Sequence, residues 1–449
     1  MKTNDLTTGD LSKHIRRIAI PASIGFFFNT MFNVVDSFYA GQLGTDALAG
    51  LALSFPIFFL IIAVSSGVGN GTSALSAIAL GKDSLKEYHQ LAKNAVLLAL
   101  VIGVVFGITA PLTVESLFLL IGASGEPLRQ GVNYTQTIFY GTVFFALNFA
   151  FNGLLNSQGD TKPFRNYLIV GFFLNLILDP LFIFGWFGLP ALGTSGVALA
   201  TIVVQAMGSV YLFYKVTKSE AFNWSLMKES TFSFTTIKAL LQQGIPAALN
   251  SATIALGIFV INFFVLMYGG DATIAAYGVS LRIEQLILLP TIGLNIAALA
   301  IVGQNYGASN VERILQVRKL TTRYGVTIMV AGMVVVLLFA APLVRIFDQT
   351  PEVVDAGVTY LRIATLVFIA YIPLNINVSV LQGIKRPNFA IYIGLFRQLL
   401  PFVIFYFLGT IIGLGIFGVW YGIVLINWVA VVITLWYTNR ELKKINFNF

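Results

Sequence analysis

The sequence predicts an all-α integral membrane protein with twelve transmembrane helices, arranged as two six-helix lobes that are parallel repeats of one another. Three observations predict this fold class. Of the 449 residues, 57% are hydrophobic and only 10% are charged, compared with about 25% charged residues in a typical soluble domain. Twelve apolar segments reach or approach the ~20 residues that cross the ~30 Å hydrocarbon core of a bilayer. Short motifs also recur along the chain at a nearly constant spacing.

The apolar segments follow a polar start, MKTNDLTTGDLSKHIRR, which contains no apolar region of the kind that a cleavable signal peptide requires. A mean hydropathy of +0.84 is typical of a chain surrounded largely by lipid. We therefore expect the lipid bilayer to be its main partner. The expected spans are 15–40, 51–80, 92–113, 133–157, 164–188, 193–217, 237–268, 276–305, 316–340, 357–383, 390–412 and 417–438.

Basic residues are concentrated on one side of this topology. With the N-terminus placed in the cytoplasm, 22 of the 27 lysine and arginine residues lie in cytoplasmic segments, whereas only Arg129 and Arg345 lie outside. The asymmetry follows the positive-inside rule and predicts a multi-pass protein of the inner (plasma) membrane with both termini in the cytoplasm. Because topology accounts for the net charge of +8, we expect no nucleic-acid partner.

The residue types that are scarce exclude much chemistry. The chain has no cysteine, which excludes disulfides, iron–sulfur clusters and thiol catalysis. Its two histidines, His14 and His89, lie in charged segments, which excludes most histidine-bound metal sites. The motifs of zinc proteases, serine hydrolases and phosphate-binding loops do not occur. We therefore expect neither an enzyme nor a bound cofactor.

The two halves of the chain carry the same motifs about 225 residues apart. Ile20-Pro21-Ala22 recurs as Ile245-Pro246-Ala247, and five further pairs follow in the same order. Six spans per half is an even number, so both halves enter the membrane in the same orientation. This predicts an N-terminal lobe at 1–217, a cytoplasmic linker at 218–236 and a C-terminal lobe at 237–449. A duplicated bundle of this kind indicates a transporter whose two lobes rock about a central cavity. The alternative is a duplication that has no role in transport.

Carboxylates inside the expected spans need an explanation, because a charge at the bilayer centre costs roughly 2.5–3.5 kcal/mol on insertion scales. Asp36 shares one face of the first span with Asn29 and Asn33, since the successive spacings are four and three residues. The two asparagines are candidates for lining a substrate cavity. Asn175 and Asp179 lie four residues apart on the fifth span and share a face in the same way.

These side chains are expected to meet. At ~1.5 Å per residue they fall in the outer half of one lobe, together with Thr201 of the sixth span and Tyr134 of the fourth. Carboxylate, amide and hydroxyl oxygens form a hard-oxygen site that suits Na⁺, which Asp36, Asn175 and Asp179 could hold. Two carboxylates close together in low dielectric can instead share a proton. The alternative is that these groups only satisfy one another across helices.

Glu284 is the third carboxylate inside an expected span. Arg282, Arg362 and Arg397 are the bases inside the spans of the same half. An interhelical ion pair is the expected arrangement, because charged groups within a membrane usually pair with one another. A role for Glu284 in transport is the alternative.

Pro21 and Gly25 predict a weak point in the first span. Proline removes one backbone donor and clashes with the carbonyl of the preceding turn, and glycine four residues later adds little packing against bending. We expect the helix to bend at Pro21–Gly25 in response to the protonation or ion binding of Asp36. A static kink, repeated at Pro246, is the alternative.

Several longer motifs resemble the multidrug and toxic compound extrusion (MATE) family. The resemblance extends over the whole chain and implies an efflux antiporter that exports amphipathic, often cationic drugs in exchange for H⁺ or Na⁺ by alternating access. The coupling ion would be the only small ion required. The motifs are Gly-Gln-Asn-Tyr-Gly at 303–307 with its basic loop, Leu-Asn-Ser-Gln-Gly-Asp at 155–160 with Lys162 and Pro163, and Leu-Arg-Ile-Glu-Gln at 281–285 with Pro290.

The resemblance is to the family branch whose acidic pair lies in the N-terminal half. In the C-terminal half the repeat partner of Asp36 is Ile261, and the seventh span offers only Asn250 and Asn262. The resemblance therefore does not imply a second cation site. It does imply that the cation or proton site is lined by Asp36, Asn175, Asp179, Thr201 and Tyr134.

Other functions remain as alternatives. A flippase for lipid-linked oligosaccharides or peptidoglycan precursors would need a basic lumen, to which Arg282, Arg362 and Arg397 could contribute. An intramembrane enzyme and a channel are not favoured, because no catalytic motif and no selectivity-filter segment occurs. Each chain contains both lobes, so we expect a monomer.

Overall fold

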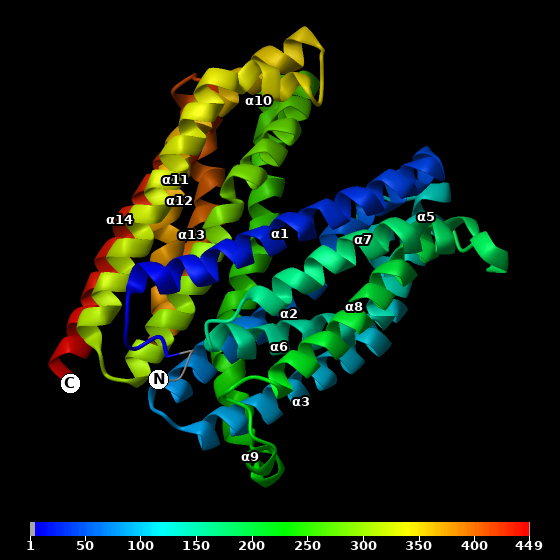
Figure 1. Cartoon of the computed structure of the whole chain (residues 1–449). Helices are drawn as coiled ribbons and strands as arrows, with labels where there is room; N and C mark the ends of the chain where they lie inside the picture. Colours follow the sequence, from blue (N-terminus) through cyan, green and yellow to red (C-terminus); the bar gives the residue numbers. More distant parts are fainter. Residues whose placement is uncertain (1–4, 449) are drawn as a thin grey trace. The chain divides into compact units, whose positions relative to one another are not determined.

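The computed structural model describes residues 5–448, except the side chains at 255 and 446–448, so Lys2, one of the basic residues counted above, lies outside the described part. These residues form helices joined by short connections, without a strand. In the order coloured from blue to red in Figure 1, the helices are α1 (Leu11–Gln42), α2 (Thr45–Gly81), α3 (Leu85–Thr109), α4 (Val114–Leu120), α5 (Gly125–Tyr140), α6 (Thr142–Ser157), α7 (Lys162–Phe184), α8 (Thr194–Thr217), α9 (Trp224–Glu229), α10 (Phe234–Gly307), α11 (Val311–Arg345), α12 (Pro351–Gly383), α13 (Phe389–Tyr406) and α14 (Ile416–Asn448).

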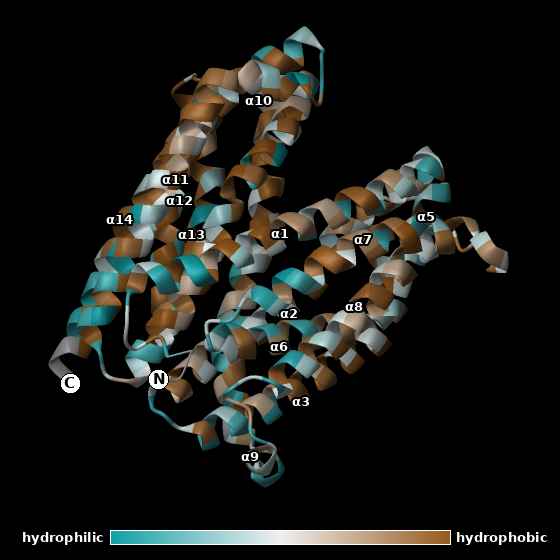
Figure 2. Cartoon of the chain, viewed as in Figure 1, coloured by the Kyte–Doolittle hydropathy of each residue, from teal (hydrophilic) through white to brown (hydrophobic). Residues whose placement is uncertain are grey.

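The long helices confirm the expected fold class. Among the described residues, ten single helices are long and apolar enough to cross a bilayer, and α5 with α6 makes a further span bent by 50°. Figure 2 shows that these helices are largely hydrophobic along their lengths. Helix α10 has 74 residues, or about 110 Å of helix, which is several times the hydrocarbon thickness. It breaks at Gly270, where φ is 71°, so α10 contains both the seventh and the eighth expected spans.

The chain divides into two compact units. The first contains Pro21–Ala248 with the start of the chain up to Thr8, and the second contains Leu249–Phe449 with Gly9–Ile20. The division therefore passes through α1 at Pro21, and through α10 two residues after Pro246. Residues 237–248 pack with the first unit although they follow the predicted linker. The lobe boundaries at 217 and 237 describe the sequence repeat rather than this packing, and they stay a prediction.

The first unit is built around α2, which packs against α3, α5 and α6. The crossing of α2 with α6 is close because glycines lie at the contact. A Cβ atom on Gly153 would come within 2.5 Å of the Gly69 carbonyl oxygen, so only glycine permits this approach. Helices α7 and α8 pack along each other, and α8 also contacts α5 and α6. These contacts position α7 and α8 beside the cavity described below.

The second unit repeats the helix pairing of the first. Within it α11 packs on α12, α12 on α14, and α13 on α14. The positions related by the repeat pack in the same way in the first unit, where α3 contacts α6, α6 contacts α8, and α7 contacts α8. The internal repeat predicted from the motifs is therefore also a repeat of packing.

The segment between α8 and α10 is tied to the first unit. The His89 ring accepts a hydrogen bond at Nε2 from the backbone N–H of Asn223 at 2.7 Å. The Lys93 ammonium donates to the carbonyl of Ser230 at 2.6 Å. His89 is fully buried, so one of the two histidines positions this connection.

Candidate functional site

The first unit contains a cavity of about 160 Å³ among α1, α2, α6, α7 and α8. Its walls are mostly phenylalanine, and its polar groups are amides, hydroxyls and one carboxylate. Among the described residues that line it, none is basic. The lining residues are Phe26, Asn29, Phe32, Asn33, Asp36, Phe55, Phe58, Phe59, Ile62, Phe145, Asn148, Phe149, Phe164, Tyr167, Leu168, Thr201 and Gln205.

Three of the predicted site residues meet at one end of this cavity. The Asn175 side-chain nitrogen donates to Asp36 Oδ1 at 2.6 Å and to Asp179 Oδ2 at 2.8 Å. The two carboxyl groups are close enough to hydrogen-bond to each other when one of them carries a proton. Asp36 is 6% exposed, and Asn175 and Asp179 are fully buried. The structure thus brings α1 and α7 together through two carboxylates and one amide.

The other predicted residues lie around this centre. Thr201 is buried on α8, and its hydroxyl donates to Asp36 Oδ2 at 3.5 Å, a long contact. Tyr134 is buried on α5 near both carboxyl groups, but no hydrogen bond joins its hydroxyl to them in the described part of the chain. Asn29 and Asn33 line the cavity, and in the described residues no hydrogen bond joins their side chains to the carboxylates; the Asn33 amide donates to the Asn29 carbonyl at 3.0 Å.

Two oxygens at this centre are buried without a hydrogen-bond partner among the described residues, namely Asn175 Oδ1 and Asp179 Oδ1. Buried acceptors are normally satisfied, because leaving one unpaired costs roughly 1–3 kcal/mol. A proton on a carboxyl group, or a cation coordinated by these oxygens, would satisfy them. The described residues contain no group of three or more acidic, histidine or cysteine side chains of the kind that holds a structural metal. The two free oxygens and the neighbouring carboxylate are all hard ligands, a donor type that suits Na⁺ or a proton.

A hydrogen-bond network that sequence reasoning missed lies next to this centre. Gln205, one turn along α8 from Thr201, accepts at Oε1 from the Tyr167 hydroxyl and from the Asn148 amide, both at 2.7 Å. Ser209, one turn further, donates to Asn148 Oδ1 at 2.9 Å. Thr201, Gln205 and Ser209 occur every four residues, a spacing that indicates one polar stripe on α8.

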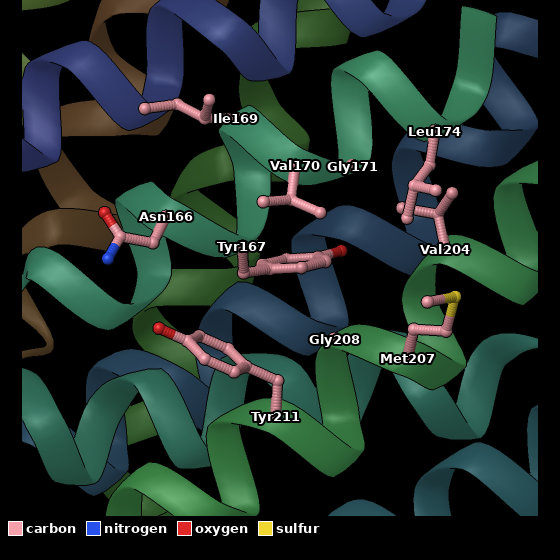
Figure 3. A pocket seen from close by; sticks show the side chains of 10 residues that line it. All are labelled: Asn166, Tyr167, Ile169, Val170, Gly171, Leu174, Val204, Met207, Gly208 and Tyr211. Atoms are coloured by element: carbon pink, nitrogen blue, oxygen red, sulfur yellow. The ribbon is translucent and has the colours of Figure 1, made fainter. Parts of the chain in front are cut away.

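Tyr167 also borders a second hollow, a groove of about 480 Å³ between α7 and α8 (Figure 3). The Tyr167 and Tyr211 rings lie at the centre of this view, with Val204 and Met207 beside them. The close approach depends on Gly208, where a Cβ atom would come within 2.3 Å of the Tyr167 ring. Tyr167 thus lines the cavity and the groove alike.

The predicted hinge residues lie within a continuous helix. Pro21 is inside α1, and no non-helical residue interrupts α1. Gly25 is buried against α7, because a Cβ atom there would come within 3.1 Å of the Arg165 Cα atom. The outer part of α1 is held to α7 by Asp36 and by the Tyr39 hydroxyl, which donates to the Leu176 carbonyl at 3.2 Å.

The second unit has a cavity of about 300 Å³ with a different set of polar groups. Glu284 and Arg397 both line it. In the described residues no ion pair joins Glu284 to any of the three arginines, so the expected interhelical pair is wrong. Arg282 and Arg362 are exposed on their helices and do not line the cavity. Arg282 is two residues from Glu284, or ~200° around the helix, which places the two side chains on opposite faces.

Comparison with known proteins agrees with this architecture. The MatE family model matches residues 21–181 and again residues 246–407, which is the same offset of about 225 residues as the internal repeat. The chain is 26% identical over 430 residues to the "Probable multidrug resistance protein NorM" of Thermotoga maritima, covering 92% of this chain and 89% of that protein. It is 27% identical over 404 residues to the "FAD transporter" of Shewanella oneidensis, covering 88% and 87%.

A solved structure gives the same result. The structure is described as the "Outward-facing conformation of a multidrug resistance MATE family transporter of the MOP superfamily", and it matches with a TM-score of 0.92 at 26% identity over 99% of both chains. The similarity thus extends to the whole fold.

Proposed function

Since the chain belongs to the MatE family, whose members are transporters rather than enzymes, we propose that it exports amphipathic cations in exchange for H⁺ or Na⁺. The observation that carries this proposal is the centre formed by Asp36, Asn175 and Asp179 beside a cavity lined by no basic residue among those described. Negative charge without a resident counter-charge attracts either a coupling ion or a cationic drug. Phenylalanine walls would hold the apolar part of the drug.

Exchange follows if the ion and the drug use the same charge. A proton or Na⁺ at Asp36 and Asp179 neutralises the cavity, and a cationic drug then loses its electrostatic partner. Each ligand therefore weakens the binding of the other, and by linkage the effect is reciprocal. Thr201 and Tyr134 complete the oxygen set in this proposal, with Thr201 as a ligand and Tyr134 close to both carboxyl groups.

Movement of α1 would link ion binding to the cavity. With a negative charge or Na⁺ at Asp36, the outer part of α1 engages α7 and α8 through Asn175 and Thr201. Protonation removes charge from these contacts, and we propose that α1 then bends at Pro21–Gly25 and narrows the cavity. The titratable groups that face Asp36 are Asp179 of α7 and Tyr134 of α5.

Two other cargoes are less well supported. A flippase for lipid-linked oligosaccharides needs a basic lumen, whereas only Arg397 of the three arginines lines a cavity, and Arg282 and Arg362 are exposed away from it. A relative is named as an FAD transporter, but a dinucleotide carries two phosphates, and the first-unit cavity offers them no basic partner in its described lining. We further propose a monomer in the inner membrane, with both termini in the cytoplasm and no cofactor besides the coupling ion.

Flux in proteoliposomes tests the proposal. Purified wild-type protein should accumulate a cationic dye against its gradient when an H⁺ or an Na⁺ gradient is applied, and the effective gradient identifies the ion. Asp36→Asn should abolish this flux. Asp46→Asn, which changes an exposed acid at the start of α2, is the matched control and should retain it. Equal flux in Asp36→Asn and wild type would refute the assignment of the site.

A further inference from the structure

We propose that the second-unit cavity is a binding site for zwitterionic amphiphiles, with Glu284 binding the ammonium group and Arg397 binding the carboxylate or phosphate. The transport of such a ligand rests on the proposed function, but its binding does not. The polar residues of the cavity are Tyr277, Glu284, Gln285, Thr291, Tyr371, Asn375, Arg397, Gln398 and Asn427, and apolar side chains such as Ile254, Ile258 and Leu288 form the remaining wall.

Glu284 is available for a cationic group. Its side chain is on α10 and only 5% exposed, with the Tyr360 side chain close by. One of its oxygens, Oε1, has no hydrogen-bond partner among the described residues. The Tyr277 ring lies on the same cavity, packed edge-on against Tyr360 at 5.2 Å between centroids. A carboxylate next to aromatic rings is the combination that recognises ammonium groups.

Arg397 is available for an anionic group. On α13 its Nε donates to Asn427 Oδ1 at 3.0 Å, and its guanidinium lies over the Tyr371 ring, 5.4 Å from the ring centroid. These contacts fix the plane of the guanidinium. A guanidinium has five N–H donors, and the two neighbours use only some of them. The remaining donors are suited to bind a carboxylate or a phosphate in a bidentate manner.

The two charges share one cavity without pairing with each other in the described structure. Glu284 is buried and Arg397 is half-buried; a charge removed from water without a partner is unfavourable, so each of these groups gains from a ligand of opposite charge. A ligand with a single charge would satisfy one group and leave the other uncompensated. A zwitterion satisfies both at once, which is why the geometry selects it over a plain cation or anion.

The repeat provides an independent argument. The repeat offset of each span relates residues of the two cavities. The first-unit cavity is lined by Asp36, Phe58 and Gln205. Their repeat partners, Ile261, Glu284 and Asn427 in the same order, line the second-unit cavity. The two cavities are therefore equivalent places in the duplicated fold. The second cavity thus recurs at the same place in the fold, and its charged groups differ from those of the first.

Calorimetry with three octyl amphiphiles tests the site. Full-length protein in nanodiscs of an anionic lipid, free of zwitterionic lipid, is titrated with octyl dimethylglycine betaine, octyl trimethylammonium and octanoate. We expect the betaine to bind at least ten-fold more tightly than either singly charged probe. Glu284→Gln should reduce betaine affinity to that of octanoate, and Arg397→Gln should reduce it to that of the ammonium probe.

Conservative variants keep the test independent of folding. Glu284→Asp and Arg397→Lys retain the charges and should retain most of the preference for betaine, and gel filtration should show a single folded species for all variants. Asp36→Asn changes only the first-unit cavity and should leave betaine binding unchanged. Dye flux is measured on the same Asp36→Asn variant. Its loss would support the proposed function, independently of whether the betaine binds in the second unit.

The natural ligand could be a dissolved zwitterion or the headgroup of a lipid, and a second arm separates these sources. Phosphatidylethanolamine added to the nanodiscs should weaken betaine binding in proportion to its mole fraction if a lipid headgroup occupies the site, and should not affect it otherwise. Either outcome supports a zwitterion site. Equal binding of the three probes, or a betaine preference that survives both glutamine variants, would overturn it.

Discussion

The two cavities differ in chemistry although the same helices of each repeat form them. The cavity of the first unit has a carboxylate centre and amides, with no basic residue in its described lining, whereas the cavity of the second unit has one acid and one base. On the first span of the repeat, Asn29, Asn33 and Asp36 of one cavity correspond to Ile254, Ile258 and Ile261 of the other. On the second span, Phe58 corresponds to Glu284. The duplication has kept the arrangement of the helices, whereas the acidic position lies on the first span in one unit and on the second span in the other.

The difference shows which part of a duplicated transporter is constrained by packing. Helix pairs recur in both units, because glycine contacts and apolar faces fix how the helices cross. Side chains that face a cavity pack against little, so substitution there costs less stability. The chemistry of the two cavities can therefore diverge while the fold stays the same, and each cavity must be assigned a ligand from its own residues.

The largest expected effect comes from moving the acid between the units. Asp36→Asn should abolish dye efflux, and adding Ile261→Asp should not restore it. The partners of Asp36 are missing from the second unit, since Asn175 and Thr201 correspond to Leu399 and Ile423. Drug-efflux assays in cells with matched protein levels measure both variants. Recovery in the double variant would mean that the position of a carboxylate, rather than its partners, determines coupling.

A smaller effect is expected from removing the acid of the second unit. Glu284→Gln should keep cationic dye efflux within about two-fold of wild type, because the dye is assigned to the first-unit cavity. No ion pair is lost, and the amide removes a buried charge that has no ion-pair partner, so the free energy of unfolding should not decrease. Efflux and thermal unfolding in detergent provide the two measurements. Loss of dye efflux in a stable Glu284→Gln protein would contradict the division between the cavities.

Tyr167→Phe tests how much the hydrogen-bond network beside the first-unit cavity contributes to stability. Loss of the hydroxyl removes the 2.7 Å hydrogen bond to Gln205 Oε1, and this oxygen still accepts from the Asn148 amide. The expected loss of stability is about 1–2 kcal/mol. Tyr211→Phe is the matched control on the neighbouring helix, because no hydrogen bond to its hydroxyl occurs in the described residues, and it should have little effect. Equal unfolding midpoints for the two variants would show that the network adds nothing to stability.

The fold and the centre of the first cavity could be predicted from sequence, because both follow from strong constraints. Spans require long apolar runs, and a carboxylate in a membrane requires polar partners. The spacing of four residues predicted that Asn175 and Asp179 share one helix face. The expected depth in the membrane predicted that Asp36 lies beside them. These three residues do meet in the structure.

Contacts that depend on weaker physical constraints were either not predicted or predicted wrongly. The residues of the hydrogen-bond network, Asn148, Tyr167 and Gln205, carry no charge. The free-energy cost of placing them in a membrane is therefore small, and one sequence does not show which way their side chains point. The polar stripe on α8 was nevertheless visible at Thr201, Gln205 and Ser209. The ion pair of Glu284 was inferred from charge alone, which does not say where a side chain points.

The smallest expected effect is the movement of α1, which only the first of the two sequence repeats should show. Helix α1 contains Pro21, and α10 contains the equivalent Pro246, but the repeat position of Asp36 is Ile261 in α10. Protonation of Asp36 weakens its contacts with Asn175 and Thr201, while the Tyr39 hydrogen bond to α7 remains. The shift should therefore amount to a few Å at most. A bias of ~1.4 kcal/mol is enough to change the two populations ten-fold.

Paired spin labels measure this movement directly. The chain has no cysteine, so Val34→Cys and Met207→Cys, both exposed and both in the first unit, can be labelled without other changes. Distances measured between pH 5 and pH 8 should shift in the wild-type background and stay constant with Asp36→Asn. Pro21→Ala restores a backbone donor and should reduce the shift, whereas Pro246→Ala, the matched control in the repeat, should preserve it. A distribution that is constant with pH in the wild type would mean that Pro21 is a static feature of α1, since the charge on Asp36 would then have no effect on the helix.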